Sequence, residues 1–381
     1  MDIELTEDQA RLQQAAIDFA RAALGRDLRE RDRDEAFDRE GWKACAEFGV
    51  LGMPVPREFG GLGLGLTDLI AVMEGLGYAG RDLGLLFSIH AHLWTNVLPI
   101  LEFGTEAQKR RYLPPLVDGT WIGANAASEP DFGSDVYGMR TRAEKRGGGY
   151  LLTGTKTFVT NAPVADLFVA YATRDPELGP LGISAFVVEA GSPGVSVSRP
   201  IDKMGLRTSP MAEVVFDGCE VPEAQRLGRE GRGVEVFESS MEWERGCILA
   251  GVLGSMRRHL EQAIAHARQR KQFGQPIGGF QAVAHRIVEM RVRLDACRPL
   301  VYRIGRLKDR GEPAQVEAAI AKLFVSEAHV ASSLDAMRVF GGYGYTVEQE
   351  IERELRDSLG GLFYSGTSDI QRNNIARALK L

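Results

Sequence analysis

The stretch Tyr150-Leu-Leu-Thr-Gly-Thr-Lys-Thr-Phe-Val-Thr160 decides the fold class of this chain. It holds two short runs, 150–153 and 157–160, that are rich in β-branched and aromatic residues and are separated by a glycine. This pattern predicts two strands. Further runs of the same kind follow, at 166–173, 183–189, 195–198 and 212–216. Short strands at this spacing predict a small β-barrel or sandwich.

On both sides of this β region the sequence pattern is helical. Before it, Thr6 precedes an amphipathic run that carries Leu12, Ala16 and Phe19 on one face, and a second helical run covers 67–80. After it come long helical runs at about 234–270, 283–310 and 312–341. The order predicts an α+β chain. We expect an N-terminal helical domain at 1–120, a middle β domain at 121–228 and a C-terminal helical bundle at 229–381.

Composition narrows the functional class. The 381 residues carry a formal net charge of −6, which argues against nucleic acid as the main partner, because phosphate binding needs a basic surface. The four cysteines form no C-x-x-C pair, so we expect reduced, mostly buried thiols. The acidic N-terminus lacks the features of a secretory signal, and no apolar run approaches the roughly 20 residues that cross a bilayer. These features predict a cytoplasmic protein that does not bind a membrane.

Two common cofactor sites do not fit the sequence. Gly61, Gly63 and Gly65 lack the G-x-G-x-x-G spacing, and no predicted strand leads into them. His90 and His92 are two residues apart, so on a helix they point to different sides. We therefore expect no Rossmann nucleotide site and no metal site.

Four segments, spread over the chain, together resemble one family. They are Ser128-Glu-Pro-Asp-Phe-Gly-Ser-Asp135, Gly154-Thr-Lys-Thr-Phe-Val-Thr-Asn161, Arg270-Lys-Gln-Phe-Gly-Gln275, and Phe340-Gly-Gly-Tyr-Gly344 with the later Tyr364-Ser-Gly-Thr367. In order and spacing they are similar to the signature segments of acyl-CoA dehydrogenases. The resemblance covers essentially the whole chain. It implies N-terminal helices, a middle β domain, a C-terminal four-helix bundle and bound FAD in a homodimer or homotetramer.

The same resemblance implies which residues hold FAD. Ser128 and Thr160 match positions that hydrogen-bond the isoalloxazine ring, and Phe158 stands where most members have a tryptophan against the flavin. The remaining matches, to the adenosine and pyrophosphate, are Arg270, Phe273, Gln281, Arg338, Gly341, Gly342 and Thr367, of which Arg270 and Phe273 reach the FAD of a neighbouring subunit. These residue types suit the role, because arginine pairs with phosphate and glycine lets the backbone approach closely.

The catalytic base departs from the commonest family pattern. Many members carry a glutamate where this chain has Ser365, and a serine hydroxyl without a partner is a poor base. A second subgroup places the glutamate on a C-terminal-domain helix just before an arginine, which matches Glu244 and Arg245. Apolar neighbours at helical spacing predict that Glu244 is buried and that its pKa is raised. The resemblance also places Ser134, Met241, Arg245, Tyr364 and Ser365 beside the substrate.

The expected reaction is FAD-dependent dehydrogenation of an acyl thioester, in which Glu244 takes a proton and flavin N5 takes a hydride. The carrier of the acyl group is either coenzyme A or an acyl carrier protein, and an electron-accepting flavoprotein or another acceptor reoxidises the flavin. His92, Trp94 and Asn96 are expected near the acyl pocket and favour a short or polar group. One alternative is oxidation of a hydroxyacyl group on a carrier protein to make a polyketide extender unit. The same fold would also suit a flavin monooxygenase or a nucleic-acid-binding protein.

Overall fold

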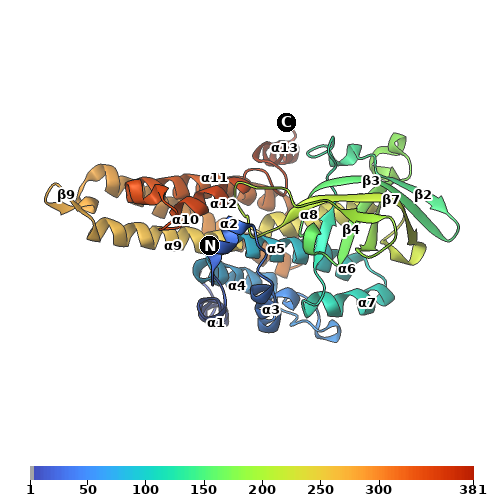
Figure 1. Cartoon of the computed structure of the whole chain (residues 1–381), viewed down its shortest axis with the longest axis horizontal. Helices are drawn as coiled ribbons and strands as arrows, with labels where there is room; N and C mark the ends of the chain where they lie inside the picture. The colour runs from blue at the N-terminus through green and yellow to red at the C-terminus, as the bar shows by residue number, and fades with distance from the viewer. Residues whose placement is uncertain (1–3) are drawn as a thin grey trace.

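A computed structural model describes residues 4–381 and has helices at both ends of the chain with a sheet between them (Figure 1). The first helices are α1 Glu7–Ala23, α2 Leu28–Asp34, α3 Arg39–Phe48, α4 Leu66–Ala79, α5 Leu83–His92, α6 Leu98–Phe103 and α7 Glu106–Val117. Thr6 begins α1 in a capping box with Gln9, which supports the predicted start of that helix. The α+β prediction is confirmed.

The helical stretch from α5 to α6 forms part of the core. Leu83–Phe103 is long and apolar enough to cross a membrane, with a mean hydropathy of 1.2, but 94% of the apolar window is buried inside the molecule. The expectation that no apolar segment has this length was therefore wrong. The polar residues within the stretch interrupt its apolar pattern, so the sequence alone did not reveal its length. A π-helical turn, Leu93–Val97, joins the two helices.

The middle of the chain forms a mixed sheet. Its strands are β1 Gly123–Ala126, β2 Arg142–Arg146, β3 Gly149–Thr160, β4 Leu167–Thr173, β5 Ile183–Glu189, β6 Val195–Val197, β7 Met211–Pro222 and β8 Arg226–Leu227. They lie in the order β6-β7-β3-β2-β4-β5-β8, with β1 parallel to β4. Alternate residues of β4 face different cores: Val169 and Tyr171 join the helical core, and Phe168 joins a second core within the sheet.

The two strands expected at 150–160 are one strand, β3. Gly154 pairs with Phe216 of β7 and does not turn the chain. The register shifts between Lys156 and Val159, and at this bulge Phe158 has a φ of 54°. A bulge redirects a side chain from its strand, and the Phe158 side chain is 63% exposed.

The last region is a helical bundle. It comprises α8 Gly233–Cys247, α9 Ala250–Gln269, α10 Gln281–Asp309, α11 Gln315–Phe340, α12 Ile351–Gly360 and α13 Ser368–Ala378, with the hairpin strands β9 Lys271–Gln272 and β10 Gln275–Pro276. The long helix expected at 234–270 is broken after Cys247, so α8 and α9 are separate. Figure 1 shows the hairpin at the end of the bundle that lies farthest from the sheet.

Candidate active site

Glu244 lies on α8 where this helix meets the sheet and the last turns of the chain. Its side chain is buried, with 8% of the residue exposed. Burial raises the pKa of the Glu244 carboxyl to about 7, although the Ser365 hydroxyl and the cations of Arg245 and Lys322 act to lower it. A carboxyl group with this pKa can act as a general base near neutral pH.

Arg245 does not neutralise Glu244 through a direct ion pair. Its Nε donates to the carbonyl oxygen of Ser365 at 3.0 Å, and Gln371 Nε2 donates to the same oxygen at 3.1 Å. Lys322 Nζ donates to the Gly361 carbonyl at 2.6 Å. Burial lowers the pKa of Lys322 to about 8, and the nearby Arg245 charge adds to this effect. Three side chains from separate helices therefore fix the turn at 361–366.

The fixed turn has an unusual backbone at Ser365. Its φ is 54°, in the left-handed region where a non-glycine residue is uncommon. Among the described residues, the Ser365 N–H meets no acceptor. Since the turn lies against Glu244, this N–H is available for a developing negative charge on a substrate carbonyl.

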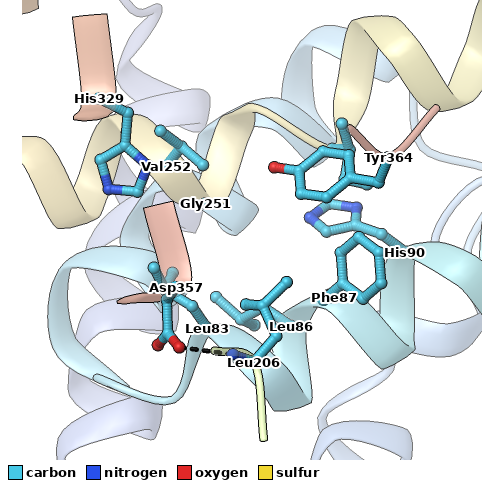
Figure 2. Close-up of a pocket in the computed structure, with 11 residues that line it drawn as sticks. Leu83, Leu86, Phe87, His90, Leu206, Gly251, Val252, His329, Asp357 and Tyr364 are labelled. Carbon is cyan, nitrogen blue, oxygen red and sulfur yellow. Dashed lines mark hydrogen bonds between the residues drawn. The ribbon is translucent and has the colours of Figure 1, made fainter. Parts of the chain in front are cut away.

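A cavity adjoins the turn at 361–366, and Tyr364 lines it. Figure 2 shows Tyr364, His90 and Phe87 on one side of the cavity, and Asp357 and His329 on the other. The Tyr364 ring packs on Phe87 with 4.8 Å between the ring centroids. Burial lowers the pKa of His90 to about 3, so its ring is neutral, and its Nδ1 accepts from Trp94 at 2.8 Å.

The prediction that His92, Trp94 and Asn96 mark the acyl pocket was wrong for their polar groups. His92 Nδ1 accepts from the Gly123 N–H at 2.9 Å, and Asn96 Oδ1 accepts from the Val169 N–H at 3.3 Å. Trp94 is fully buried, donates to His90 and stacks on Trp243. These side chains attach the core helix to the sheet and leave no polar group for a substrate.

The residues predicted to hold the flavin ring lie together at the end of β3. The Ser128 carbonyl accepts from the Thr157 N–H at 2.9 Å, which places Ser128 beside the bulge that carries Phe158. Thr160 pairs with Met211 of β7. A flat apolar ring exposed next to two hydroxyl side chains provides a surface that fits an isoalloxazine ring.

A buried ion pair supports this edge of the site. Lys156 Nζ donates to Glu129 Oε1 at 2.9 Å, and the same carboxylate accepts from the N–H groups of Arg140 and Thr141. The loop between Glu129 and Arg140 carries Ser134, which is exposed. Its Tyr137 donates to Glu238 of α8 at 2.9 Å, so the loop is joined to the helix that bears Glu244.

The residues predicted to bind the rest of FAD fall into separate places. Arg270 and Phe273 lie at the hairpin end of the bundle, where Phe273 is 93% exposed and the Arg270 guanidinium is 5.7 Å from the Tyr343 ring centroid. Gly341 and Gly342 precede Tyr343, and a Cβ on either would meet no atom within 4 Å. The open backbone and exposed cation fit the phosphates and adenine of FAD.

The other predicted positions lie on helix ends and surfaces. Arg338 is exposed near the end of α11 and pairs with Asp335 at 3.4 Å. Gln281 is exposed at the start of α10. Thr367 is the N-cap of α13, where its Oγ1 accepts from Ile370 N–H at 3.2 Å. Met241 is buried one turn before Glu244.

Sequence reasoning missed several polar groups of the site. Lys322, Gln371 and the buried Tyr171 were not predicted. A lysine between the apolar residues of 318–325 was the one available signal, because a buried lysine requires partners. Within residues 4–381, no group of three or more histidine, cysteine, aspartate or glutamate side chains is arranged to hold a metal ion.

Comparison with known proteins identifies the family that this geometry fits. Family models for the acyl-CoA dehydrogenase N-terminal, middle and C-terminal domains match residues 6–120, 124–219 and 231–380. The chain is 49% identical to an L-prolyl-[peptidyl-carrier protein] dehydrogenase of Pseudomonas fluorescens, over 91% of each chain. It is 42% identical to the enzyme of that name from a Serratia species, over 100% of this chain and 99% of the other.

Solved structures agree with these sequence matches. The prolyl acyl carrier protein oxidase AnaB has a TM-score of 0.98 and 46% identity, covering 99% of this chain and 100% of the other. The structure of PigA with FAD and proline has a TM-score of 0.98 and 42% identity, over 100% of both chains. These relatives are named for prolyl groups, so the expected hydroxyacyl alternative is not supported, and neither is the monooxygenase.

Proposed function

Because this chain belongs to the acyl-CoA dehydrogenase family and is an FAD-dependent dehydrogenase, we propose that it oxidises an L-prolyl group held as a thioester on a carrier protein, with Glu244 as the base. The observation that carries the assignment of the base is the burial of Glu244, with its pKa near 7, beside the free N–H of Ser365. The prolyl group is inferred from the names of the relatives with 49% and 42% identity.

In this proposal three groups of the chain act on the substrate or on the turn beside it. Glu244 removes the proton from the carbon next to the thioester carbonyl. The Ser365 N–H stabilises the negative charge that develops on the carbonyl oxygen, and Arg245 with Gln371 holds this turn in place. When bound, FAD would supply the acceptor for the hydride that leaves the β-carbon. The substrate loses one proton and one hydride and gains a double bond between these two carbons.

We also propose that a second copy of the chain completes the FAD site. Arg270 and Phe273 flank strand β9, which Figure 1 shows at the far end of the bundle. Phe158 lies on β3 in the sheet, and Ser128 is hydrogen-bonded to the same strand. Apolar side chains are exposed one turn apart on two bundle helices, Val288 and Val292 on α10 and Ile320 and Phe324 on α11. A homodimer or homotetramer would cover these faces. The molar mass from light scattering tests this assembly.

The remaining partners follow from the same reaction. An electron-accepting flavoprotein or another acceptor would reoxidise the flavin between turnovers.

The proposed compartment is the cytoplasm. The four cysteines are free and buried, which suits a reducing compartment of this kind.

The experiment that tests the proposed function is anaerobic bleaching of the flavin absorption in the purified holoenzyme. The enzyme is mixed with a carrier protein loaded with L-prolyl, with the unloaded carrier protein, or with isovaleryl-CoA. We expect fast bleaching with the prolyl thioester alone. Bleaching by isovaleryl-CoA and not by the prolyl thioester would return the assignment to ordinary acyl-CoA dehydrogenation.

A further inference from the structure

We propose that the side-chain hydroxyl of Ser365 binds the ring nitrogen of the prolyl substrate and thereby selects an aminoacyl group over a hydrocarbon acyl group. This inference rests on the proposed function and deepens it, because it names the group that recognises the substrate class. It concerns the side chain of Ser365, separately from the N–H of the same residue.

The hydroxyl of Ser365 is buried and has no partner at ordinary hydrogen-bond geometry, although it lies near the Glu244 carboxyl and acts to lower its pKa. Its Oγ is shielded from solvent and makes no hydrogen bond of ordinary geometry with any described residue. A buried hydroxyl without a partner costs free energy. Ser326, Ser332, Ser333 and Ser368 share this state, and Ser365 differs from them in acting on the Glu244 carboxyl. A ligand that supplies the missing partner would remove this cost.

The hydroxyl also lies in the right place. It is close enough to Glu244 to influence the carboxyl, although no hydrogen bond of normal geometry joins the two. Glu244 must approach the hydrogen on the α-carbon, and the prolyl nitrogen is bonded to that carbon about 1.5 Å away. A group beside the Glu244 carboxyl is therefore also beside the nitrogen when the substrate is bound.

The backbone gives a separate argument for the side chain. At a φ of 54° serine is strained, whereas glycine adopts this conformation without cost. If the position had only to provide an N–H group, glycine would serve better. A hydroxyl both donates and accepts, so it can pair with the secondary amine in its neutral or its protonated form. A hydrocarbon acyl group would offer the hydroxyl no polar partner.

The test compares two thioesters on the same carrier protein. One carries L-prolyl and the other cyclopentanecarbonyl, which has the same ring size and a carbon in place of the nitrogen. The initial rate of anaerobic flavin bleaching gives kcat/KM for the wild type, Ser365→Ala and Ser365→Gly. The glycine variant relieves the backbone strain, so it separates the hydroxyl from the conformation of the turn and remains informative if the alanine variant folds poorly.

The matched control is Ser333→Ala. Ser333 also has a buried hydroxyl without a partner, but it lies eleven residues beyond Lys322 on α11, about 16 Å farther along the helix axis. We expect the loss of kcat/KM in both Ser365 variants to be about ten- to hundredfold larger for the prolyl thioester than for cyclopentanecarbonyl. Ser333→Ala should resemble the wild type with both.

An equal loss with both thioesters, or no loss with either, would overturn the role of the hydroxyl while leaving the proposed function in place. A wild-type enzyme that does not oxidise the prolyl thioester would instead remove the proposed function itself, and with it this inference. The two failures are therefore separated by the wild-type measurement alone.

Discussion

Glu244 and Glu354 are both buried glutamates of the helical bundle, with 8% and 3% of the residue exposed, but they have opposite properties. Burial raises the pKa of Glu244 to about 7, and no cation pairs with it directly. Burial alone would also raise the pKa of Glu354, but Arg258 and His259 outweigh this effect and hold it well below 4.5. The comparison shows that the partners of a buried carboxyl decide whether it can exchange a proton.

The surroundings of the two groups explain the difference. Glu354 accepts hydrogen bonds from Arg258 and from Ser255, the latter at 2.7 Å. Around Glu244 the cations are directed elsewhere, since Arg245 donates to Ser365 and Lys322 to Gly361. The charged form of Glu354 is therefore fully paired. The carboxylate of Glu244 has no direct counter-ion, so it readily takes up a proton from a substrate.

The largest effect that we expect is on catalysis in Glu244→Gln. Without the base, the rate of flavin bleaching by the prolyl thioester should fall by about 10²- to 10⁴-fold. FAD binding and the folded structure should persist, because the amide has the same shape and needs no counter-ion. The FAD absorption spectrum and circular dichroism check this. Wild-type bleaching rates in the variant would remove Glu244 from the mechanism. The difference between Glu244 and Glu354 would then have no catalytic meaning.

The site shows what could be predicted from the sequence. The resemblance to acyl-CoA dehydrogenases predicted the glutamate before Arg245 as the base, and this assignment stays a prediction. The short runs of β-branched and aromatic residues predicted the strands near Tyr150 and Leu167, which the structure confirms. The bulge at Phe158 was not predicted, because a register shift depends on the partner strand β7. A strand pattern describes one chain segment and holds no information about its neighbours.

Long-range pairing accounts for the other errors. The partner of Arg245 lies 120 residues away at Ser365, and no local pattern indicates such a contact. His92 and Asn96 were expected near the acyl pocket because, by resemblance to the family, their segment runs beside it. Their partners are backbone groups of the sheet, at Gly123 and Val169. Whether a buried polar residue serves structure or function is decided by these contacts.

The second prediction concerns stability. Glu354→Gln leaves the charge of Arg258 buried without its counter-ion, so the free energy of unfolding should fall by about 3–5 kcal/mol. Urea denaturation measures this change. The control is Glu289→Gln on α10, whose side chain is 61% exposed and lies 4.0 Å from Arg293; it should change stability by less than about 0.5 kcal/mol. A Glu354 variant as stable as the control would contradict the structural role of this glutamate.

The smallest expected effect is the pH dependence of stability, and it tests the comparison directly. A carboxyl whose pKa is raised by folding, from 4.5 to about 7 in Glu244, binds its proton more tightly in the folded state. Its contribution to stability is therefore fully present below pH 4.5 and is lost as the pH rises through 7. Glu244→Gln does not titrate. The variant should match the wild type near pH 4.5 and be more stable at pH 8–9, by up to about 3 kcal/mol.

Other groups titrate in the same range, including Asp357, whose pKa burial raises to about 7. They are common to both proteins, so the difference between the wild-type and variant unfolding free energies isolates Glu244. Glu354 gives the opposite sign, because its contribution is present above pH 4.5 and is lost as the pH falls through its lower pKa. A difference between wild type and Glu244→Gln that is constant from pH 5 to 9 would mean that Glu244 titrates alike in the folded and unfolded states. It could then not be the poorly paired base that the comparison with Glu354 requires.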